Sequence, residues 1–285
     1  MSHDLVTLAE IDAAADYIRE KTQHTPQVGL ILGSGLGSLI EAIESADAIP
    51  FVEIPHFPIS TVRGHSGRLI IGQLEGHAIF AMQGRAHYYE GYSMGRVTLP
   101  IRVMQRLGIQ VLIVTNAAGG LNSNFQAGDL MLITDHINLI GMAGLNPLHG
   151  PNLDEFGPRF PDMSVAYDRE LCQLARQSAA EADLTLREGI YICLAGPSFE
   201  TPADLEFLRL IGADAVGMST VPEVTVARHG GTRVLGISGI SNMAVFDPTQ
   251  TQEASHEEVL EAGQLIVPKL TAVIRGTLRR LSLGS

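Results

Sequence analysis

The chain has little basic charge. Its 285 residues include 31 Asp and Glu but only 19 Lys and Arg, and its lysines are Lys21 and Lys269. The net charge of −12 argues against nucleic acid and anionic membranes as partners, because an acidic surface is repelled by both. The shortage of lysine also excludes a phosphate-binding P-loop, because that loop requires lysine directly before serine or threonine.

Cysteine and long apolar stretches are also scarce. The two cysteines, Cys172 and Cys193, show no metal or redox spacing, so both are predicted to be buried, reduced thiols. No stretch reaches the length of a transmembrane helix, and the acidic N-terminus MSHDLVTLAE lacks the apolar core of a signal peptide. We therefore expect a cytoplasmic protein with no membrane partner.

The sequence does contain a clear alternation of strand and helix patterns. The predicted strands are Val28–Leu32, Leu69–Leu74, Ala78–Met82, Val111–Thr115, Leu130–Thr134, Ile190–Leu194 and Arg233–Ser238. The predicted helices are Leu8–Tyr17, Val97–Leu107, Tyr167–Glu181, Pro202–Ile211, Val221–His229 and His256–Leu281. Several strands are continuous apolar runs, which is typical of a sheet covered on both faces.

This alternation indicates the fold class. A Glu-Gly turn joins Leu69–Leu74 to Ala78–Met82 as an antiparallel hairpin, so the sheet is mixed. We predict a single domain over residues 1–285 of the α/β class, with a mixed, mostly parallel β-sheet flanked by helices. The Pro/Gly-rich stretch 141–162 has no pattern of its own, and a loop of that length is usually functional.

The stretch ILGSGLG, residues 31–37, opens a strand–turn–helix pattern. Its first two glycines fit a dinucleotide fingerprint, but Ser38 stands where the third glycine belongs. Glu53 follows at the distance of a ribose-binding acid, so a dinucleotide site stays possible. A glycine turn at a helix start also suits any anion, because its backbone N–H groups are free, and Ser34 would add a hydroxyl. A plain turn with glycines for shape is the third interpretation.

Polar residues gather at the ends of several predicted strands, where open α/β sheets bind ligands. Arg85 and His87 follow Ala78–Met82 in an extended loop and are two residues apart, so they can point the same way. An arginine can grip an oxyanion with two N–H groups, and a histidine can add a third donor. Small residues in Asn116-Ala-Ala-Gly-Gly120 let a ligand approach the backbone. An incidental surface loop and a tight turn are the alternatives at these two places.

Four further residues occupy comparable positions. Glu200 and Ser219 each lie just before a predicted helix, where the helix dipole favours negative charge. Asn242 follows the predicted strand Arg233–Ser238, a place where asparagine is usually a turn residue. His65 lies in a glycine-framed loop, where a surface role is the simpler interpretation. None of these residues identifies a ligand alone.

Several segments together resemble the trimeric purine nucleoside phosphorylases that act on 6-oxopurine nucleosides. These segments are ILGSGLG, GHSG, MQGRAHYYEGY, TNAAGGL, GPSFETPAD, VGMSTVPEV, and SNM followed by SHEEVLEAG. They run from about residue 28 to 265 and keep the family's order. The resemblance implies phosphorolysis of purine nucleosides (inosine, guanosine and their deoxy forms) to free base and α-(deoxy)ribose 1-phosphate, a purine salvage reaction.

The resemblance also implies a site, with inorganic phosphate as co-substrate and with no cofactor or metal. Phosphate would contact Ser34, His65, Arg85, His87, Ala117 and Ser219. The ribose would meet Tyr89, Met218 and His256, together with Phe160 of a neighbouring subunit in a homotrimer. The base would meet Ala118, Phe199, Glu200, Val216 and Asn242. The catalytic residues would be His87, Glu200, Asn242 and His256.

Two of these residues fit the implied chemistry. An ionised Glu200 can only accept hydrogen bonds, which matches the N1–H donor of a 6-oxopurine and mismatches the N1 acceptor of adenine. Asn242 can donate to N7 of the leaving purine and stabilise the charge that develops there. The chain departs from animal members of the family at Ala86, Ser241 and Met243, and these departures bear on base selectivity.

Three rival functions stay open at this point. The related methylthioadenosine phosphorylases tend to carry an aspartate where Asn242 stands. A dinucleotide-dependent oxidoreductase would explain ILGSGLG but would leave Arg85, Glu200 and Asn242 without roles. A nucleoside-binding protein without catalysis is the third, although no key position is lost. Phosphate-dependent cleavage of inosine separates these functions, whereas Glu200 does not settle the use of xanthosine.

Overall fold

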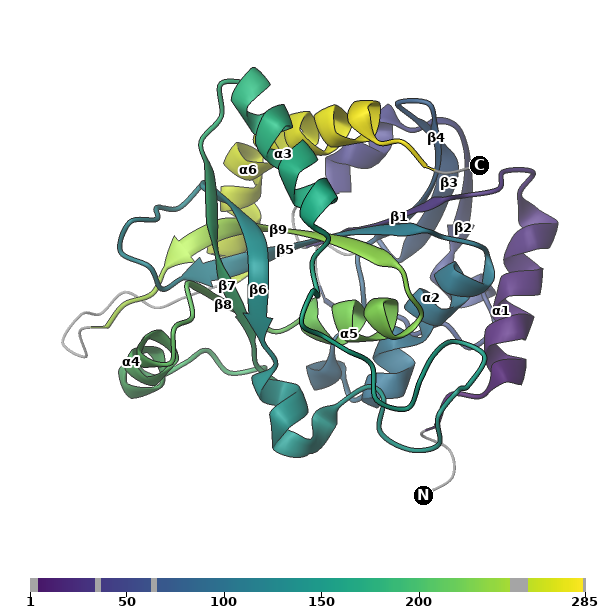
Figure 1. Ribbon diagram of the computed structural model, residues 1–285, viewed down its shortest axis with the longest axis horizontal. Helices are drawn as coiled ribbons and strands as arrows, with labels where there is room; N and C mark the ends of the chain where they lie inside the picture. Colours follow the sequence, from purple (N-terminus) through teal and green to yellow (C-terminus); the bar gives the residue numbers. More distant parts are fainter. Residues whose placement is uncertain (1–4, 34–36, 63–65, 247–255, 284–285) are drawn as a thin grey trace.

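The computed structural model of the chain describes residues 5–33, 37–62, 66–246 and 256–283. Within these residues, helices cover both sides of a mixed β-sheet (Figure 1). The strands are β1 Val28–Leu32, β2 Glu44–Pro50, β3 Arg68–Leu74, β4 His77–Gln83, β5 Val111–Gly120, β6 Leu130–Ile137, β7 Leu186–Cys193, β8 Ala215–Gly217 and β9 Arg233–Met243. The predicted α/β class with a mixed sheet flanked by helices is confirmed.

The sheet has an open half and a closed half that share β5. Its strand order is β2-β3-β4-β1-β5-β8-β7-β6-β9, and β9 pairs again with β5, so the strands from β5 to β9 close into a ring. β3 and β4 form the predicted antiparallel hairpin. β5 is parallel to both β1 and β9, and β1 is parallel to β4. Because parallel strands end at one edge, the carboxyl ends of β1, β4, β5 and β9 gather there.

The helices cover the sheet from two sides. They are α1 Leu8–Lys21, α2 Met94–Arg106, α3 Arg169–Glu181, α4 Pro202–Leu210, α5 Val221–His229 and α6 His256–Arg280. Figure 1 shows α3 and α6 together on one side of β5 and β9, with α1, α2 and α5 on the other. The predicted start of α4 is confirmed. The Thr201 hydroxyl accepts from the Asp204 N–H at 3.2 Å, and the Asp204 carboxylate accepts from the Thr201 N–H at 2.9 Å.

Some elements differ from the sequence-based expectation. The helix predicted after ILGSGLG is wrong: residues Gly37–Ala42 form a short 3-10 helix, η1, because β2 begins only two residues later and leaves no length for an α-helix. β2 and β8 were not predicted. β2 is mostly exposed, and β8 has 3 residues, too few to show a period. The stretch 141–162 was predicted to be structureless but begins with the π-helix η4, Gly141–Leu145.

The apolar runs from which the strands were predicted also form the core. All five residues of β1 are buried, and so are the first six of β5. Cys172 and Cys193 are buried and form no disulfide, as predicted, and burial raises the pKa of the Cys172 thiol to about 11. Across the described ranges, we find no helix that is both long and apolar enough to cross a membrane.

Candidate active site

A small cavity lies where the ends of β1 and β4 meet β5 and β8. Its volume is about 120 Å³, the space of roughly four water molecules at ~30 Å³ each, which suits a single tetrahedral oxyanion. Its walls are formed by Gly33, Arg85, His87, Tyr89, Asn116, Ala117, Gly217, Met218, Ser219 and Val259. We call this cavity the anion pocket. It brings together four of the residues predicted to bind phosphate, whereas Ser34 and His65 lie outside the described residues.

Gly33, at the end of β1, shows what the first glycine of ILGSGLG does. A Cβ atom at this position would lie 2.8 Å from Asn116 Cα and 3.1 Å from the carbonyl oxygen of Thr115, both backbone atoms that cannot easily move. The Gly33 N–H donates to the Thr115 hydroxyl at 3.2 Å. This glycine therefore allows β1 to approach β5 closely at the wall of the anion pocket, a need that a dinucleotide site does not explain.

Arg85 is the buried cation of the pocket. Its Nη1 donates to the Ser219 hydroxyl at 2.8 Å, and its Nη2 donates to the carbonyl oxygen of Thr115. Its Nε lies 3.3 Å from Oε1 of Glu223, and the two side chains are 3% and 4% exposed. Both terminal nitrogens thus already donate to protein oxygens. The expected bidentate grip on phosphate stays a prediction, while the role of Arg85 in holding Ser219 and β5 is visible directly.

Thr220 connects these groups from a strained backbone position. Its φ of 75° is unusual for a β-branched residue, and its side chain is fully buried. The hydroxyl of Thr220 accepts from Asn116 Nδ2 at 2.8 Å, and its N–H donates to Glu223 at 2.9 Å. These bonds fix the start of α5 beside the pocket and so fix the position of Ser219.

His87 is oriented by a carboxylate that the sequence analysis did not single out. Its backbone N–H donates to Glu90 Oε1 at 2.7 Å, and its Nδ1 lies 3.1 Å from the same oxygen. Burial would raise the pKa of Glu90, but hydrogen bonds from His87 and Thr61 outweigh it and lower that pKa to about 2. An ionised carboxylate only accepts, so Nδ1 carries a proton. The His87 ring also stacks on Tyr89 at 4.8 Å.

Sequence reasoning therefore missed the three residues that hold the phosphate-binding candidates in place: Glu90, Thr220 and Glu223. A signal for two of them existed. Each glutamate follows the residue whose N–H it accepts by three positions, in His87-x-x-Glu90 and Thr220-x-x-Glu223, which is the spacing of a capping box. The pattern by itself indicates only where a helix starts, because it gives no information about which side chains face a cavity.

The predicted ribose-binding residues Tyr89 and Met218 meet around Gly196. A Cβ atom on Gly196 would lie 2.3 Å from Met218 Sδ and 3.0 Å from Tyr89 Cδ1, and the φ of Gly196 is +63°. Glycine is therefore required where the loop after β7 crosses these two side chains. His256 begins α6, but its side chain lies outside the described residues. Phe160 is 88% exposed and does not enter the site of its own chain.

The predicted base-binding residues Ala118, Val216 and Asn242 lie on three adjoining strands. Gly119 of β5 pairs with Val216 of β8 on one side and with Asn242 of β9 on the other. The hydroxyl of Ser241 lies 2.9 Å from Asn242 Oδ1, so it can donate to that oxygen. With its oxygen engaged in this way, the amide of Asn242 presents Nδ2, a donor, to a ligand.

Glu200 and Phe199 lie in the loop between β7 and α4. Phe199 is 50% exposed, and Glu200 is half-buried. Burial raises the pKa of Glu200, the nearby charge of Asp204 raises it further, and a backbone N–H offsets part of this rise. No hydrogen bond between Glu200 and Asn242 is present in the described structure, so a ligand would have to bridge them. A separate cavity of about 820 Å³ adjoins Asn242, Met243 and Phe246, whereas Phe199 and Glu200 do not line it.

Among the residues that the structure describes, no three His, Cys, Asp or Glu side chains lie close enough to hold a metal ion together. The groups that the described site offers are a buried guanidinium, an oriented imidazole, hydroxyls at a helix start and an amide donor on β9.

Comparison with known proteins places this geometry in context. A family model described as the phosphorylase superfamily matches residues 27–279. Purine nucleoside phosphorylase 1 of Bacillus subtilis is 55% identical over 258 residues, which are 90% of this chain and 93% of that protein.

Solved structures agree with the sequence relatives. Isoform 2 of purine nucleoside phosphorylase from Schistosoma mansoni, in complex with cytosine and ribose-1-phosphate, superposes with a TM-score of 0.93 at 46% identity. The match covers 98% of this chain and 99% of that one. A purine nucleoside phosphorylase of the same organism in complex with inosine has a TM-score of 0.94 at 41% identity, with 98% and 99% covered.

Proposed function

The chain belongs to the phosphorylase superfamily, and from that membership and the geometry of its site we propose how it cleaves purine nucleosides. It is a purine nucleoside phosphorylase: it uses inorganic phosphate to split a purine nucleoside into the free base and ribose 1-phosphate.

The anion pocket supports phosphate as the nucleophile. Its volume of about 120 Å³, the buried guanidinium of Arg85 and the hydroxyl of Ser219 suit one phosphate ion. As the bond from C1′ to N9 lengthens, positive charge develops on the sugar, and a phosphate oxygen held beneath C1′ stabilises it and then bonds to C1′. Local donors supply the attraction, which an acidic chain with a net charge of −12 needs.

We assign the stabilisation of the leaving purine to Asn242. The bonding electrons of the broken C–N bond pass to the purine ring, and negative charge reaches N7. The Nδ2 donor of Asn242, held by the 2.9 Å contact of Ser241 with Oδ1, stabilises that charge as it develops. Each step uses only phosphate and side chains, so we propose that the reaction requires no cofactor and no metal.

Selectivity for 6-oxopurines is assigned to Glu200 and Asn242 together. Inosine and guanosine carry N1–H, which an ionised Glu200 accepts, whereas the bare N1 of adenosine would face a second acceptor. A buried polar mismatch of this kind can discriminate by about 10⁴–10⁵. A methylthioadenosine phosphorylase would need an acceptor for a 6-amino group at position 242, which the donor end of Asn242 does not offer.

One assay tests the function. Purified protein is incubated with inosine, with and without phosphate, and hypoxanthine and ribose 1-phosphate are quantified. We expect release of both products in equal amounts and only with phosphate. Hypoxanthine release without phosphate would indicate a hydrolase, and no release would indicate a binding protein.

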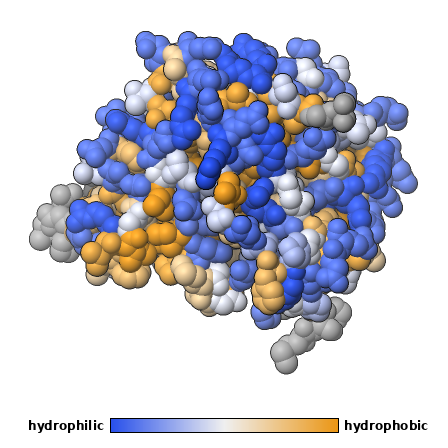
Figure 2. All heavy atoms as spheres, viewed as in Figure 1, coloured by the Kyte–Doolittle hydropathy of each residue, from blue (hydrophilic) through white to orange (hydrophobic). Residues whose placement is uncertain are grey.

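We further propose that the active unit is a homotrimer in which Phe160 covers the ribose of a neighbouring subunit. Phe160 is 88% exposed, a state that is unfavourable for an aromatic ring in an isolated chain. On α4, Leu210 is 85% and Phe207 is 51% exposed. Figure 2 shows this apolar surface gathered over α4, close to the loop that carries Phe199 and Glu200. A contact between subunits would bury both Phe160 and the apolar surface of α4 beside the site.

Mixed assemblies test this arrangement. Phe160→Ala and Asn242→Ala subunits are each expected to lose nearly all activity alone. When the two variants are dissociated, mixed and reassembled, some interfaces combine an intact Asn242 with an intact Phe160 from the neighbour. Activity should then reappear. If mixing restores nothing while size-exclusion profiles show mixed trimers, Phe160 acts within its own chain.

A further inference from the structure

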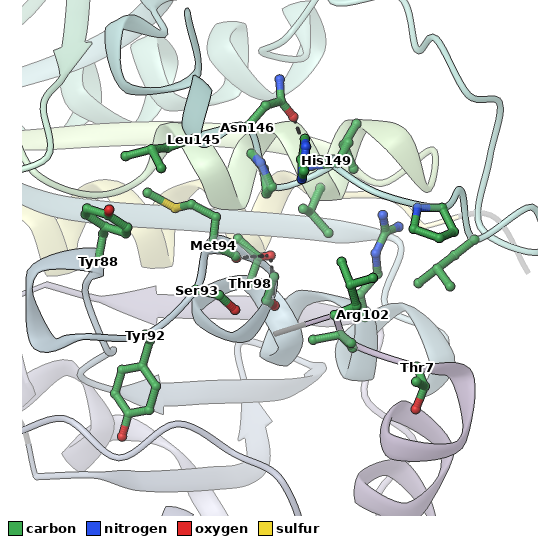
Figure 3. A pocket seen from close by; sticks show the side chains of 18 of the residues that line it. Thr7, Tyr88, Tyr92, Ser93, Met94, Thr98, Arg102, Leu145, Asn146 and His149 are labelled. Carbon is green, nitrogen blue, oxygen red and sulfur yellow. Dashed lines mark hydrogen bonds between the residues drawn. The ribbon is translucent and has the colours of Figure 1, made fainter. Parts of the chain in front are cut away.

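A second, larger cavity lies on the side of the molecule that carries α1 and α2. Its volume is about 1050 Å³, at the upper end of the ~300–1000 Å³ range of ligand pockets. It is enclosed by the start of α1, the first turns of α2 and the segment 144–153 (Figure 3). Much of its wall is apolar and includes Leu5, Val6, Met94, Leu145, Leu148 and Leu153. We call it the α1–α2 cavity.

Arg102 is a buried, charged residue in the wall of this cavity. It is 6% exposed, and in Figure 3 its side chain rises from α2 toward the segment that carries Asn146 and His149. Within the described chain its only hydrogen bond goes to Gln105 at 3.3 Å, and no carboxylate pairs with it. Its guanidinium also lies 4.7 Å from the centre of the Phe156 ring. Burial alone lowers the pKa of Arg102 to about 10, which still leaves it charged at neutral pH.

A neighbouring arginine on the same helix is paired with carboxylates, which is the usual arrangement for arginine. Arg106 lies one turn further along α2 and 5.3 Å from the same Phe156 ring. Unlike Arg102, it forms ion pairs with Asp12 at 2.6 Å and with Glu155 at 2.9 Å. Buried charges are normally paired, so the missing partner of Arg102 is the unusual feature of α2.

No acidic side chain of the described residues raises the pKa of Arg102, and the nearby His229 is neutral at neutral pH because its own pKa is lowered. The pKa of the buried His229 is lowered first by burial and then by the positive charges of Arg102 and Arg159. His229 is bonded to Asn152, a residue of the cavity wall, at 3.1 Å. The cavity therefore combines an apolar wall with an uncompensated positive charge.

We propose that the α1–α2 cavity binds a small amphipathic anion: one ring or short hydrocarbon chain that carries a single carboxylate, sulfonate or phosphate group. The anionic group pairs with Arg102, and the apolar part packs against the leucines of the wall. The site is distinct from the anion pocket, although Tyr89 lines both cavities. An occupant that reaches Tyr89 would also alter the KM for nucleoside.

The probe is 8-anilinonaphthalene-1-sulfonate, titrated into the intact enzyme saturated with ribose 1-phosphate and hypoxanthine, which together fill the phosphate, ribose and base parts of the catalytic site. We expect saturable fluorescence with one site per chain. Displacement is then measured with 1-naphthoate and with 1-naphthalenemethanol, which share a ring but differ in charge. The anion should displace the probe at least ten times more effectively, and phosphate monoesters of 1-naphthol distinguish phosphate from carboxylate preference.

Matched variants assign the binding to Arg102. Arg102→Gln removes the charge and should weaken probe binding at least tenfold with the KM for phosphate unchanged. Arg106→Gln removes a paired charge on the same helix and should leave probe binding unchanged. Leu148→Trp keeps Arg102 but fills the cavity, and should abolish binding even if Arg102→Gln cannot be purified folded.

Several results would overturn the proposal. They are absence of saturable binding, equal displacement by the neutral and anionic naphthalenes, and unchanged affinity in Arg102→Gln. Unchanged affinity in Leu148→Trp would do the same. Thermal melting of each variant shows whether it is folded.

Discussion

The two halves of the active site are built in different ways. On the phosphate side, Arg85 and Glu223 are each 3% exposed and Thr220 is fully buried, and hydrogen bonds join them to Ser219 and β5. On the base side, Phe199 is 50% exposed. The phosphate side is interlocked by hydrogen bonds between buried side chains, whereas the base side combines the buried Ala118 and Val216 with half-buried and exposed residues.

This difference follows what each half recognises. Phosphate is the same in every turnover, and a preorganised set of donors stabilises developing charge without reorganisation. Among the described residues, the side chain of Asn242 is hydrogen-bonded to Ser241 alone, so its substitution disturbs few other interactions. We therefore expect changes on the phosphate side to affect catalysis and folding together, and changes on the base side to affect catalysis and selectivity with little effect on folding.

The largest effect is expected from Arg85→Ala. It removes the cation of the anion pocket and leaves Glu223 buried without its partner, so the remaining carboxylate repels phosphate. Losing charged hydrogen bonds worth about 1.5–3 kcal/mol each should lower kcat/KM for phosphate by about 100-fold or more. The measurement is initial rate against phosphate concentration at saturating inosine.

Measuring the stability of Arg85→Ala distinguishes the loss of phosphate binding from the loss of the buried ion pair with Glu223. Breaking a buried ion pair at 3.3 Å should lower the free energy of unfolding by about 3 kcal/mol. The double variant Arg85→Ala with Glu223→Gln removes the unpaired charge, so it should recover stability but not phosphate affinity. A single variant with normal stability and a normal phosphate KM would show that the interlocked pocket is not the phosphate site.

Much of this fold could be predicted from the sequence because its strands are long apolar runs. β1, β3, β4 and β5 were found by that signal, and the hairpin by its turn. The closed ring could not be predicted, because it depends on β9 pairing with β5 and β6, strands far apart in the chain. β8 was missed because 3 residues carry no periodicity.

The site was predictable where short motifs carry the chemistry. Arg85, His87 and Ser219 were found and line one cavity, as their positions at strand and helix ends suggested. Their supports were not found. Glu90 and Glu223 act through contacts with side chains already in the site, and sequence spacing does not reveal which carboxylates are buried. The unpaired charge of Arg102 could not be predicted from the sequence either, because whether a charge has an ion-pair partner depends on how the chain packs.

A smaller effect, on selectivity, is expected from Asn242→Asp. Aspartate could accept from the 6-amino group of adenosine and, when protonated, still donate to N7. The ratio of kcat/KM for adenosine to that for inosine should rise by about tenfold to a hundredfold, at about 1.4 kcal/mol per tenfold. Ser241 stays in place, so the melting temperature should hardly change. An unmoved ratio would mean that residue 242 does not recognise the 6-position.

The smallest effect concerns the pH dependence of base recognition by Glu200. Its pKa is raised from 4.5 by burial and then by the charge of Asp204. The ionised form accepts from N1–H, so activity on inosine should be full above the raised pKa and fall as pH drops through it. Asp204→Asn removes the nearby negative charge and should shift this acidic limb to lower pH by a fraction of a unit, which a profile of kcat/KM would resolve.

Glu200→Gln removes the titrating carboxylate altogether. A neutral amide accepts less strongly from N1–H, so kcat/KM for inosine should fall about tenfold at neutral pH. The acidic limb that belongs to Glu200 should then disappear, because no group that titrates is left at this position. An acidic limb with the same midpoint in Glu200→Gln would assign that titration to another group and would remove the carboxylate from base recognition. Because Glu200 is half-buried and outside the interlocked pocket, the phosphate KM should not change, which keeps the two halves of the site experimentally separate.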